Sequence, residues 1–139
     1  MAENLIEVRN LKKYFSTPRG MLHAVDNVTF NIEKGKTIGI VGESGCGKST
    51  LGKTLMRLHT ATSGEVIYQG QDIASMPLKE FKKNYRSHIQ MIFQDPYASL
   101  DPRMNVLQLV EEPIRVQNPK LPKKEVERQA QDMMNLVGL

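Results

Sequence analysis

Hydrophobic and polar residues follow two different patterns along this chain, a strand-like one first and a helical one afterwards. Short apolar stretches with partial alternation predict strands over residues 5–15, 24–32, 36–41, 65–68 and 88–93. The helical pattern, together with Pro at a first turn, predicts helices over residues 77–85, 106–117 and 123–137. The order therefore indicates an α/β region followed by an all-helical one, and no repeat or linker interrupts it.

The last predicted helix shows its apolar face clearly. Its stripe is made of Val126, Ala130, Met133, Met134 and Val137. These positions fall on one side of a helix, and Gly138 stands where a left-handed C-terminal cap is common. We expect the stripe to be an ordinary core face.

A glycine-rich motif joins the strand predicted over 36–41 to a helix whose apolar face would hold Leu51, Leu55 and Leu58. The stretch GESGCGKST, residues 42–50, fits the P-loop pattern G-x-x-x-x-G-K-[ST]. Glycine lets the backbone wrap around an anion, and the N–H groups near the helix start can point at phosphate oxygens. Lys48 supplies charge for the β and γ phosphates, and the Ser49 hydroxyl can bind Mg²⁺. The predicted nucleotide-binding residues of this loop are Gly42, Ser44, Gly45, Cys46, Gly47, Lys48, Ser49 and Thr50.

Composition narrows the remaining possibilities. The chain has 139 residues, enough for one domain, and its net charge of +4 is dispersed. Its most basic stretch, residues 120–128, also carries two Glu residues and is typical of a solvated helix face, so no nucleic-acid partner is expected. No long apolar run predicts a membrane span, and no signal peptide is recognisable. A single cysteine and three well-separated histidines predict neither an internal disulfide nor a metal cluster, which fits an intracellular setting.

Taken together, these residues resemble the ATP-binding subunits of ABC transporters, and more narrowly the oligopeptide and dipeptide importer branch. Residues 42–50 resemble the Walker A motif of that family. The block FQDPYASLDPR, residues 93–103, is similar to the Q-loop in the form found in the peptide-importer branch. The segment LKKYF, residues 11–15, is similar to the one in which an aromatic side chain stacks on adenine.

The resemblance implies a role for individual residues. Lys48 and Gln94 would be catalytic, with Gln94 contacting Mg²⁺ and the attacking water and sensing the γ-phosphate. Ser49 would be the second protein ligand of Mg²⁺. Tyr14 would stack on the adenine of ATP, and Val25 would touch the base or the sugar, although Val25 is equally well explained as strand core.

The resemblance also implies an architecture and partners. The fold would be α/β of the P-loop NTPase class, with an antiparallel β subdomain and an incomplete RecA-like core over residues 1–102. Residues 103–139 would begin the helical subdomain, which docks on transmembrane permease subunits. The other implied partners are a second ATP-binding subunit and, indirectly, an extracellular substrate-binding protein. The implied location is peripheral, on the cytoplasmic face of the cell membrane.

Several parts of the family pattern are absent from the sequence. We find no LSGGQ-like signature motif, no Walker B Asp-Glu pair, no D-loop and no switch histidine, so the chain resembles an N-terminal part of a subunit. Alone, it is expected to bind nucleotide at most and not to hydrolyse it. A P-loop GTPase or a small-molecule kinase remains an alternative. A GTPase would be expected to carry an [NT]-K-x-D motif, which is absent, and a kinase would need an arginine-rich lid, whereas few arginines follow the loop. A third possibility is a non-catalytic nucleotide-binding module.

Overall fold

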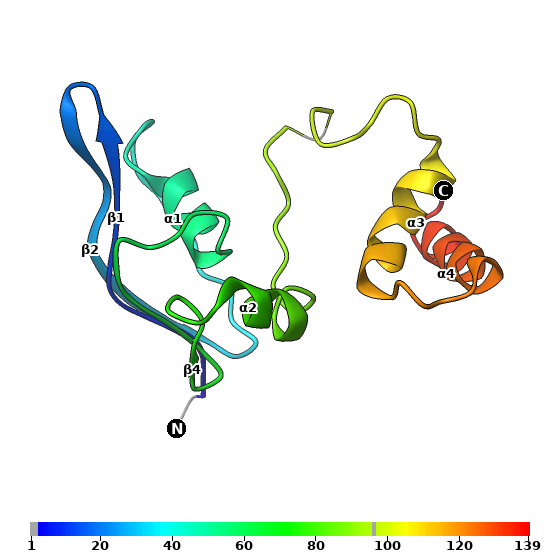
Figure 1. Ribbon diagram of the computed structural model, residues 1–139, viewed down its shortest axis with the longest axis horizontal. Helices are drawn as coiled ribbons and strands as arrows, with labels where there is room; N and C mark the ends of the chain where they lie inside the picture. Colours follow the sequence, from blue (N-terminus) through cyan, green and yellow to red (C-terminus); the bar gives the residue numbers. More distant parts are fainter. Residues whose placement is uncertain (1–2, 96) are drawn as a thin grey trace. The chain divides into compact units, whose positions relative to one another are not determined.

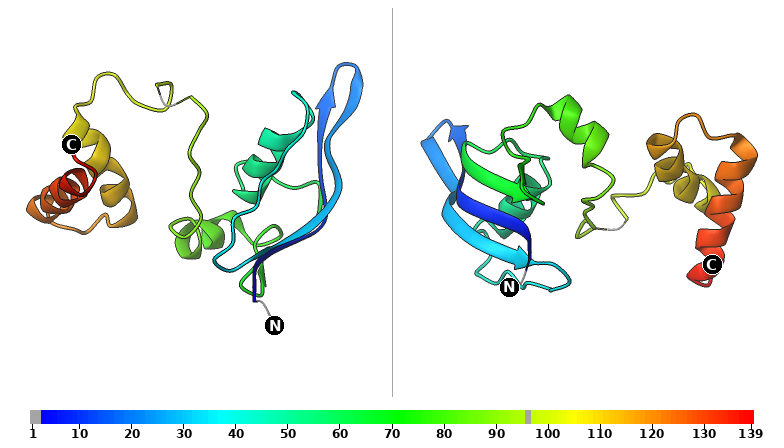
Figure 2. Two further views of the ribbon diagram at one scale, coloured as in Figure 1. Left: turned by 180° about the vertical axis from the view of Figure 1, so that it is seen from behind. Right: turned by 90° about the horizontal axis from the view of Figure 1, so that it is seen from below.

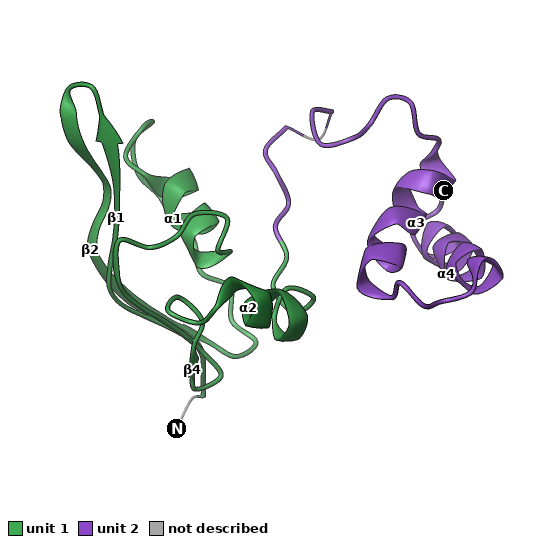
Figure 3. Ribbon diagram, viewed as in Figure 1, with its two compact units in different colours: residues 1–90 green, residues 91–139 purple. Residues whose placement is uncertain are grey.

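The computed structural model describes residues 3–95 and 97–139, which form two compact units. The first unit is Met1–Gln90 and the second is Met91–Leu139 (Figure 3). The elements of the first unit are β1 (Asn4–Thr17), β2 (Gly20–Glu33), α1 (Lys48–Leu55), β3 (Ser63–Tyr68), β4 (Gln71–Asp72) and α2 (Leu78–Asn84). The second unit contains α3 (Val106–Gln117) and α4 (Lys123–Leu136). The predicted boundary after residue 102, between a partial ATP-binding core and the start of a helical subdomain, is a functional division and stays a prediction.

The first unit is built on an antiparallel four-stranded sheet with the strand order β2-β1-β3-β4. A long hairpin of β1 and β2 dominates it (Figure 1). Pro18 and Arg19 form the turn, and the pairing of Thr17 with Gly20 closes it. From there the register places Tyr14 opposite His23 and Phe15 opposite Leu22. The predicted antiparallel β subdomain is therefore confirmed.

The hydrophobic core of this unit lies between the sheet and its helices (Figure 2). Its buried members are Val8, Leu11, Val25, Leu51, Val66, Tyr68, Ile73 and Phe81. Phe81 of α2 is completely buried, and the guanidinium carbons of Arg57 and Arg86 lie 5.3 and 5.5 Å from its ring centre. Cations over an aromatic face add to the stability that burial provides.

Two predicted strands are not strands in the structure. Residues 36–41 and 88–93 take no strand conformation, and Val41 and Ile92 are 92% and 98% exposed. Both segments read as buried core strands because they are short apolar runs. A strand of that kind is defined by neighbours on both sides and helices on both faces. Among the described residues neither segment has a strand partner, so the prediction of core strands was wrong here.

The helix after the glycine loop is shorter than its apolar pattern suggests. It ends at Leu55, and Arg57 has a left-handed backbone with φ 53°. A non-glycine residue in that conformation stops a right-handed helix. Leu58 consequently lies outside the helix and is 43% exposed, whereas Leu51 is buried as expected.

The second unit confirms both predicted helices, with α3 matching its predicted limits and α4 ending one residue earlier. A capping box begins α3, in which the Asn105 side chain accepts from Gln108 N–H and the Gln108 side chain accepts from Asn105 N–H, each at 2.9 Å. Only part of the α4 stripe is core. Val126 and Ala130 are buried, but Met133 and Val137 are 59% and 70% exposed. Within residues 3–95 and 97–139, no helix is both long and apolar enough to cross a bilayer.

Candidate phosphate-binding site

The glycine loop ends where helix α1 begins. Gly47 is the residue before the helix, with φ 100°, and Lys48 is the first helical residue. No side chain caps this end of α1, and its first turn holds no acidic residue. The first N–H groups of a helix have no partner within the helix, so an uncapped end can donate them to an anion.

Two glycines of the loop are required for different reasons. Gly45 has φ +80°, a conformation that L residues rarely adopt, and the space beside it is open. Gly47 has φ +100°, and a Cβ there would lie 2.0 Å from the backbone oxygen of Ala24 in β2. The missing side chain of Gly47 therefore lets strand β2 lie directly against the loop.

Lys48 points back over the loop it follows. Its Nζ donates to the backbone oxygens of Gly42 at 2.8 Å and Glu43 at 2.6 Å, and it lies 3.6 Å from Cys46 Sγ. None of these partners is a carboxylate, so no side chain in the described part of the loop neutralises the ammonium. The positive charge stands beside the uncapped helix end, and the two together favour a negatively charged ligand.

A pocket of about 360 Å³ opens at this place, within the size range of small-molecule sites. The loop forms one wall, with Gly45, Cys46, Gly47, Lys48, Ser49 and Thr50. The hairpin forms the other wall, with Phe15, Leu22, His23 and Ala24. Gly42 and Ser44 belong to the same loop but do not line the pocket. A larger pocket, of about 680 Å³ between α3 and α4, has no glycine loop to bind a phosphate.

The remaining predicted residues lie elsewhere. The Tyr14 ring stacks on His23, and its hydroxyl donates to Asp26 Oδ1 at 2.5 Å. This hydrogen bond is the main reason that the pKa of Tyr14 is raised. Val25 is 4% exposed and belongs to the core, so its side chain does not line the pocket. Gln94 is exposed and belongs to the second compact unit.

Sequence reasoning missed the hairpin wall. No role was assigned to Phe15 or Leu22 from the sequence, and His23 entered only as one of three well-separated histidines that predict no metal cluster. The signal that could have found them is the turn at Pro18 and Arg19. A two-residue turn fixes the register of a hairpin, and counting back from it places His23 opposite the aromatic Tyr14.

Comparison with known proteins gives consistent results. The ABC transporter family model matches residues 25–139. The chain is 44% identical over 139 residues to the oligopeptide transport ATP-binding protein OppF of Bacillus subtilis, covering 100% of this chain and 46% of that protein. It is 43% identical over 145 residues to the dipeptide transport ATP-binding protein DppF of Escherichia coli, covering 100% and 43%. The chain thus spans less than half the length of these relatives.

Solved structures share the fold. A dimeric bacterial ABC transporter cassette, MJ0796, superimposes with a TM-score of 0.79 at 26% identity, covering 96% of this chain and 57% of that one. The protein cbiO1 of Clostridium perfringens, part of an ABC transporter complex, gives a TM-score of 0.75 at 27% identity, covering 99% and 51%. A further MJ0796 structure is described as a post-hydrolysis state bound to ADP and Pi.

Proposed function

Because the chain belongs to the ABC transporter family, we propose that its glycine loop binds the phosphates of ATP. The observation that carries this proposal is the position of Lys48, whose ammonium lies over the loop with only backbone oxygens and a sulfur as partners. A GTPase or a kinase outside this family is not retained, since the family match covers residues 25–139.

Different groups of the loop contact different parts of the triphosphate. The N–H groups between Gly45 and Thr50 donate to phosphate oxygens, and Lys48 places its charge at the β and γ phosphates. Because glycine has no side chain, the loop backbone can approach the phosphates closely enough to form these hydrogen bonds. The loop thus binds and orients the triphosphate, and its donors are aimed at the groups whose charge increases during phosphoryl transfer.

Mg²⁺ fits the donor set of this site. The exposed Ser49 is the second residue of α1 and lines the pocket. Mg²⁺ usually takes few protein oxygens and completes its shell with water and substrate phosphates, so one hydroxyl and one amide oxygen suffice. We assign the hydroxyl to Ser49, and we carry over from the family resemblance the proposal that Gln94 supplies the amide oxygen and orients the attacking water. When bound, Mg²⁺ neutralises charge on the phosphates.

For the whole protein, we propose an ATP-binding subunit that couples ATP binding and hydrolysis to the uptake of oligopeptides or dipeptides. The names of the relatives OppF and DppF support the substrate class. The dimeric state of the MJ0796 cassette supports a second ATP-binding subunit as partner. Permease subunits and, indirectly, an extracellular substrate-binding protein complete the proposed assembly, at the cytoplasmic face of the membrane.

Replacing Lys48 tests the phosphate site. Lys48→Ala should weaken the binding of Mg-ATP and of inorganic tripolyphosphate more than tenfold by isothermal titration calorimetry, because one charge-assisted contact is typically about 1.5–3 kcal/mol. Unfolding without ligand should change little, since Lys48 is not part of the hydrophobic core and its Nζ bonds only to the exposed loop.

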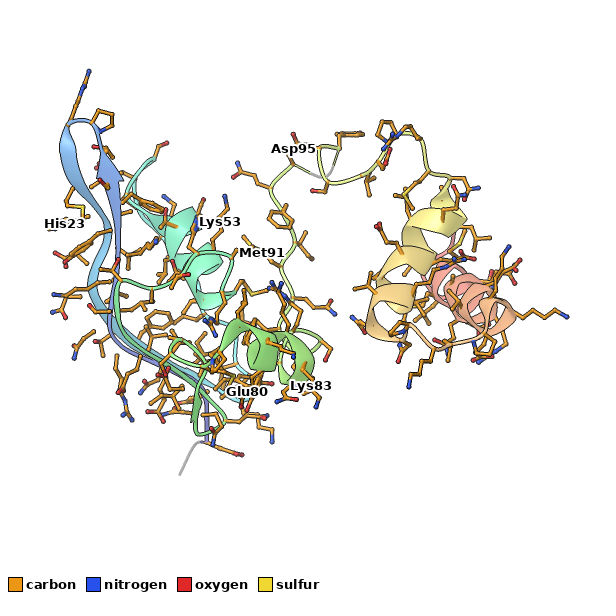
Figure 4. The ribbon with its side chains drawn as sticks, viewed as in Figure 1. His23, Lys53, Glu80, Lys83, Met91 and Asp95 are labelled. Atoms are coloured by element: carbon orange, nitrogen blue, oxygen red, sulfur yellow. The ribbon has the colours of Figure 1, made fainter. Side chains whose placement is uncertain are left out.

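Lys53→Ala is the matched control. Lys53 is a second lysine of α1, in its last turn (Figure 4). It should leave both affinities unchanged. A Lys48→Ala chain that binds both ligands like the wild type would refute the phosphate site. In the whole protein, the same substitution should abolish ATP hydrolysis.

A further inference from the structure

The short helix α2 carries a basic face at the surface of the first unit. Lys79, Lys82 and Lys83 lie three and four residues apart, so their side chains share one side of the helix. All three residues are exposed, and Lys83 is labelled in Figure 4. Phe81, on the opposite side, is completely buried in the core and holds the helix in place. These three lysines, the basic face of α2, are therefore carried by a firmly packed element.

The charge of the basic face is not neutralised within the described part of the chain. No ion pair there includes Lys79, Lys82 or Lys83, whereas the guanidinium of Arg128 pairs with two carboxylates. Glu80, the one acidic residue of α2, is exposed and pairs with none of the three. The ammonium groups are thus open to an external anion.

The stability of the helix does not explain this arrangement. Lys82 and Lys83 stand in the last turn, where the helix dipole favours cations. Lys79 is the second residue of α2, where the same dipole disfavours a positive charge, and it repels the lysines three and four positions further on. The complete face is therefore formed at a cost to the helix, which indicates a ligand outside the chain.

The residues of the basic face indicate the kind of partner. Arginine suits bidentate recognition of a single carboxylate or phosphate, whereas a lysine ammonium acts as a hydrated point charge. A face made only of lysines therefore suits a surface that carries many anions. Leu78, four residues before Lys82, is 46% exposed beside it. Basic and apolar side chains that are exposed together are typical of contacts with a lipid interface.

We infer that the basic face of α2 binds the anionic lipid headgroups of the membrane. The inference rests on the proposed function for its location, since the cytoplasmic leaflet carries the anionic lipids that attract basic segments. Each lysine near such a surface strengthens binding about fivefold. The contact is separate from the phosphate site, because its lysines belong to α2 and do not line the pocket at the glycine loop.

Sedimentation with lipid vesicles tests the inference on the full chain. The wild type should bind vesicles of phosphatidylcholine mixed with phosphatidylglycerol, bind vesicles of phosphatidylcholine alone far less, and lose this difference at high salt. Replacing Lys79, Lys82 and Lys83 together by Gln should weaken binding to the anionic vesicles about 100-fold. Replacing the same three by Arg should preserve it, because attraction to the surface depends on charge.

The matched control removes the same charge elsewhere. Replacing Lys120, Lys123 and Lys124 together by Gln lowers the net charge equally and leaves the basic face intact, so vesicle binding should stay at the wild-type level. Lys79→Gln alone should weaken vesicle binding about fivefold without lowering the free energy of unfolding, because it removes a cation that the helix disfavours.

Equal loss of vesicle binding in the control variant would show that only net charge matters, and would overturn the inference. A wild type that treats both kinds of vesicle alike would do the same, as would a single-stranded oligonucleotide that binds the basic face more tightly than the anionic vesicles.

The proposed function is tested apart from this, by calorimetry with tripolyphosphate in the absence of vesicles. If tripolyphosphate binding depends on Lys48 while vesicle binding ignores the basic face, only the inference fails. If vesicle binding depends on the basic face while tripolyphosphate does not bind, only the phosphate site is contradicted.

Discussion

Replacing Gly47 by alanine tests two features of this position, which are its left-handed backbone and its close contact with strand β2. The backbone there has φ +100°, and a Cβ would lie 2.0 Å from the Ala24 oxygen. Real Cβ contacts essentially never fall under 3.0 Å, so strand or loop must move by 3.0 − 2.0, about 1 Å. Left-handed backbone costs an L residue about 1–2 kcal/mol, and forcing an atom into a packed site costs about 1–3 kcal/mol. The sum predicts that Gly47→Ala lowers the free energy of unfolding by about 2–5 kcal/mol.

Two other glycines provide matched controls for this substitution. Gly45 has φ +80° but open space beside it, so Gly45→Ala should cost only the backbone part, about 1–2 kcal/mol. Gly52 lies inside helix α1 with open space and no positive φ, so Gly52→Ala should stabilise by about 0.5–1 kcal/mol. Urea unfolding followed by circular dichroism would give all three values.

The order of the three variants is the result that matters. If Gly47→Ala is no less stable than Gly45→Ala, the contact between β2 and the loop is not present in solution. The same contact should influence binding. Because Gly47→Ala displaces the hairpin wall from the loop, the affinity for Mg-ATP should fall beyond any loss shown by Gly45→Ala in the same titration.

The second unit gives two further predictions. Asn105→Ala should lower the free energy of unfolding of the second unit by about 1 kcal/mol, because it removes the side chain that accepts from the Gln108 N–H. A melting temperature equal to that of the wild type would contradict the capping role. Glu125 has its pKa lowered from 4.5 to about 2, mainly by the hydrogen bond from Arg128, so its contribution to folding is present above pH 4.5 and is lost as the pH falls towards about 2. Helicity at 222 nm should fall over that window, less steeply in Glu125→Gln, and equal slopes would contradict this assignment.

The sequence by itself determined the features whose causes are local. The glycine loop was placed correctly because positive φ angles and a helix start directly after Gly47 depend on neighbouring residues. Helix α3 was predicted to the residue for the same reason, since its capping box and its apolar period lie within one short segment. The long hairpin also follows from a local turn and two runs of strand-forming residues.

Tertiary structure decided what depends on partners distant in the sequence. Residues 36–41 and 88–93 carry the composition of core strands, yet a strand exists only where another strand accepts its hydrogen bonds. The α4 stripe likewise fixes which side is apolar, but Val126 is buried and Val137 exposed because only the first has neighbours that cover it. The identity of the second pocket wall is of this kind too. His23 lies beside the glycine loop because the missing side chain of Gly47 lets β2 pack against the loop, and this contact joins two segments that are distant in the sequence.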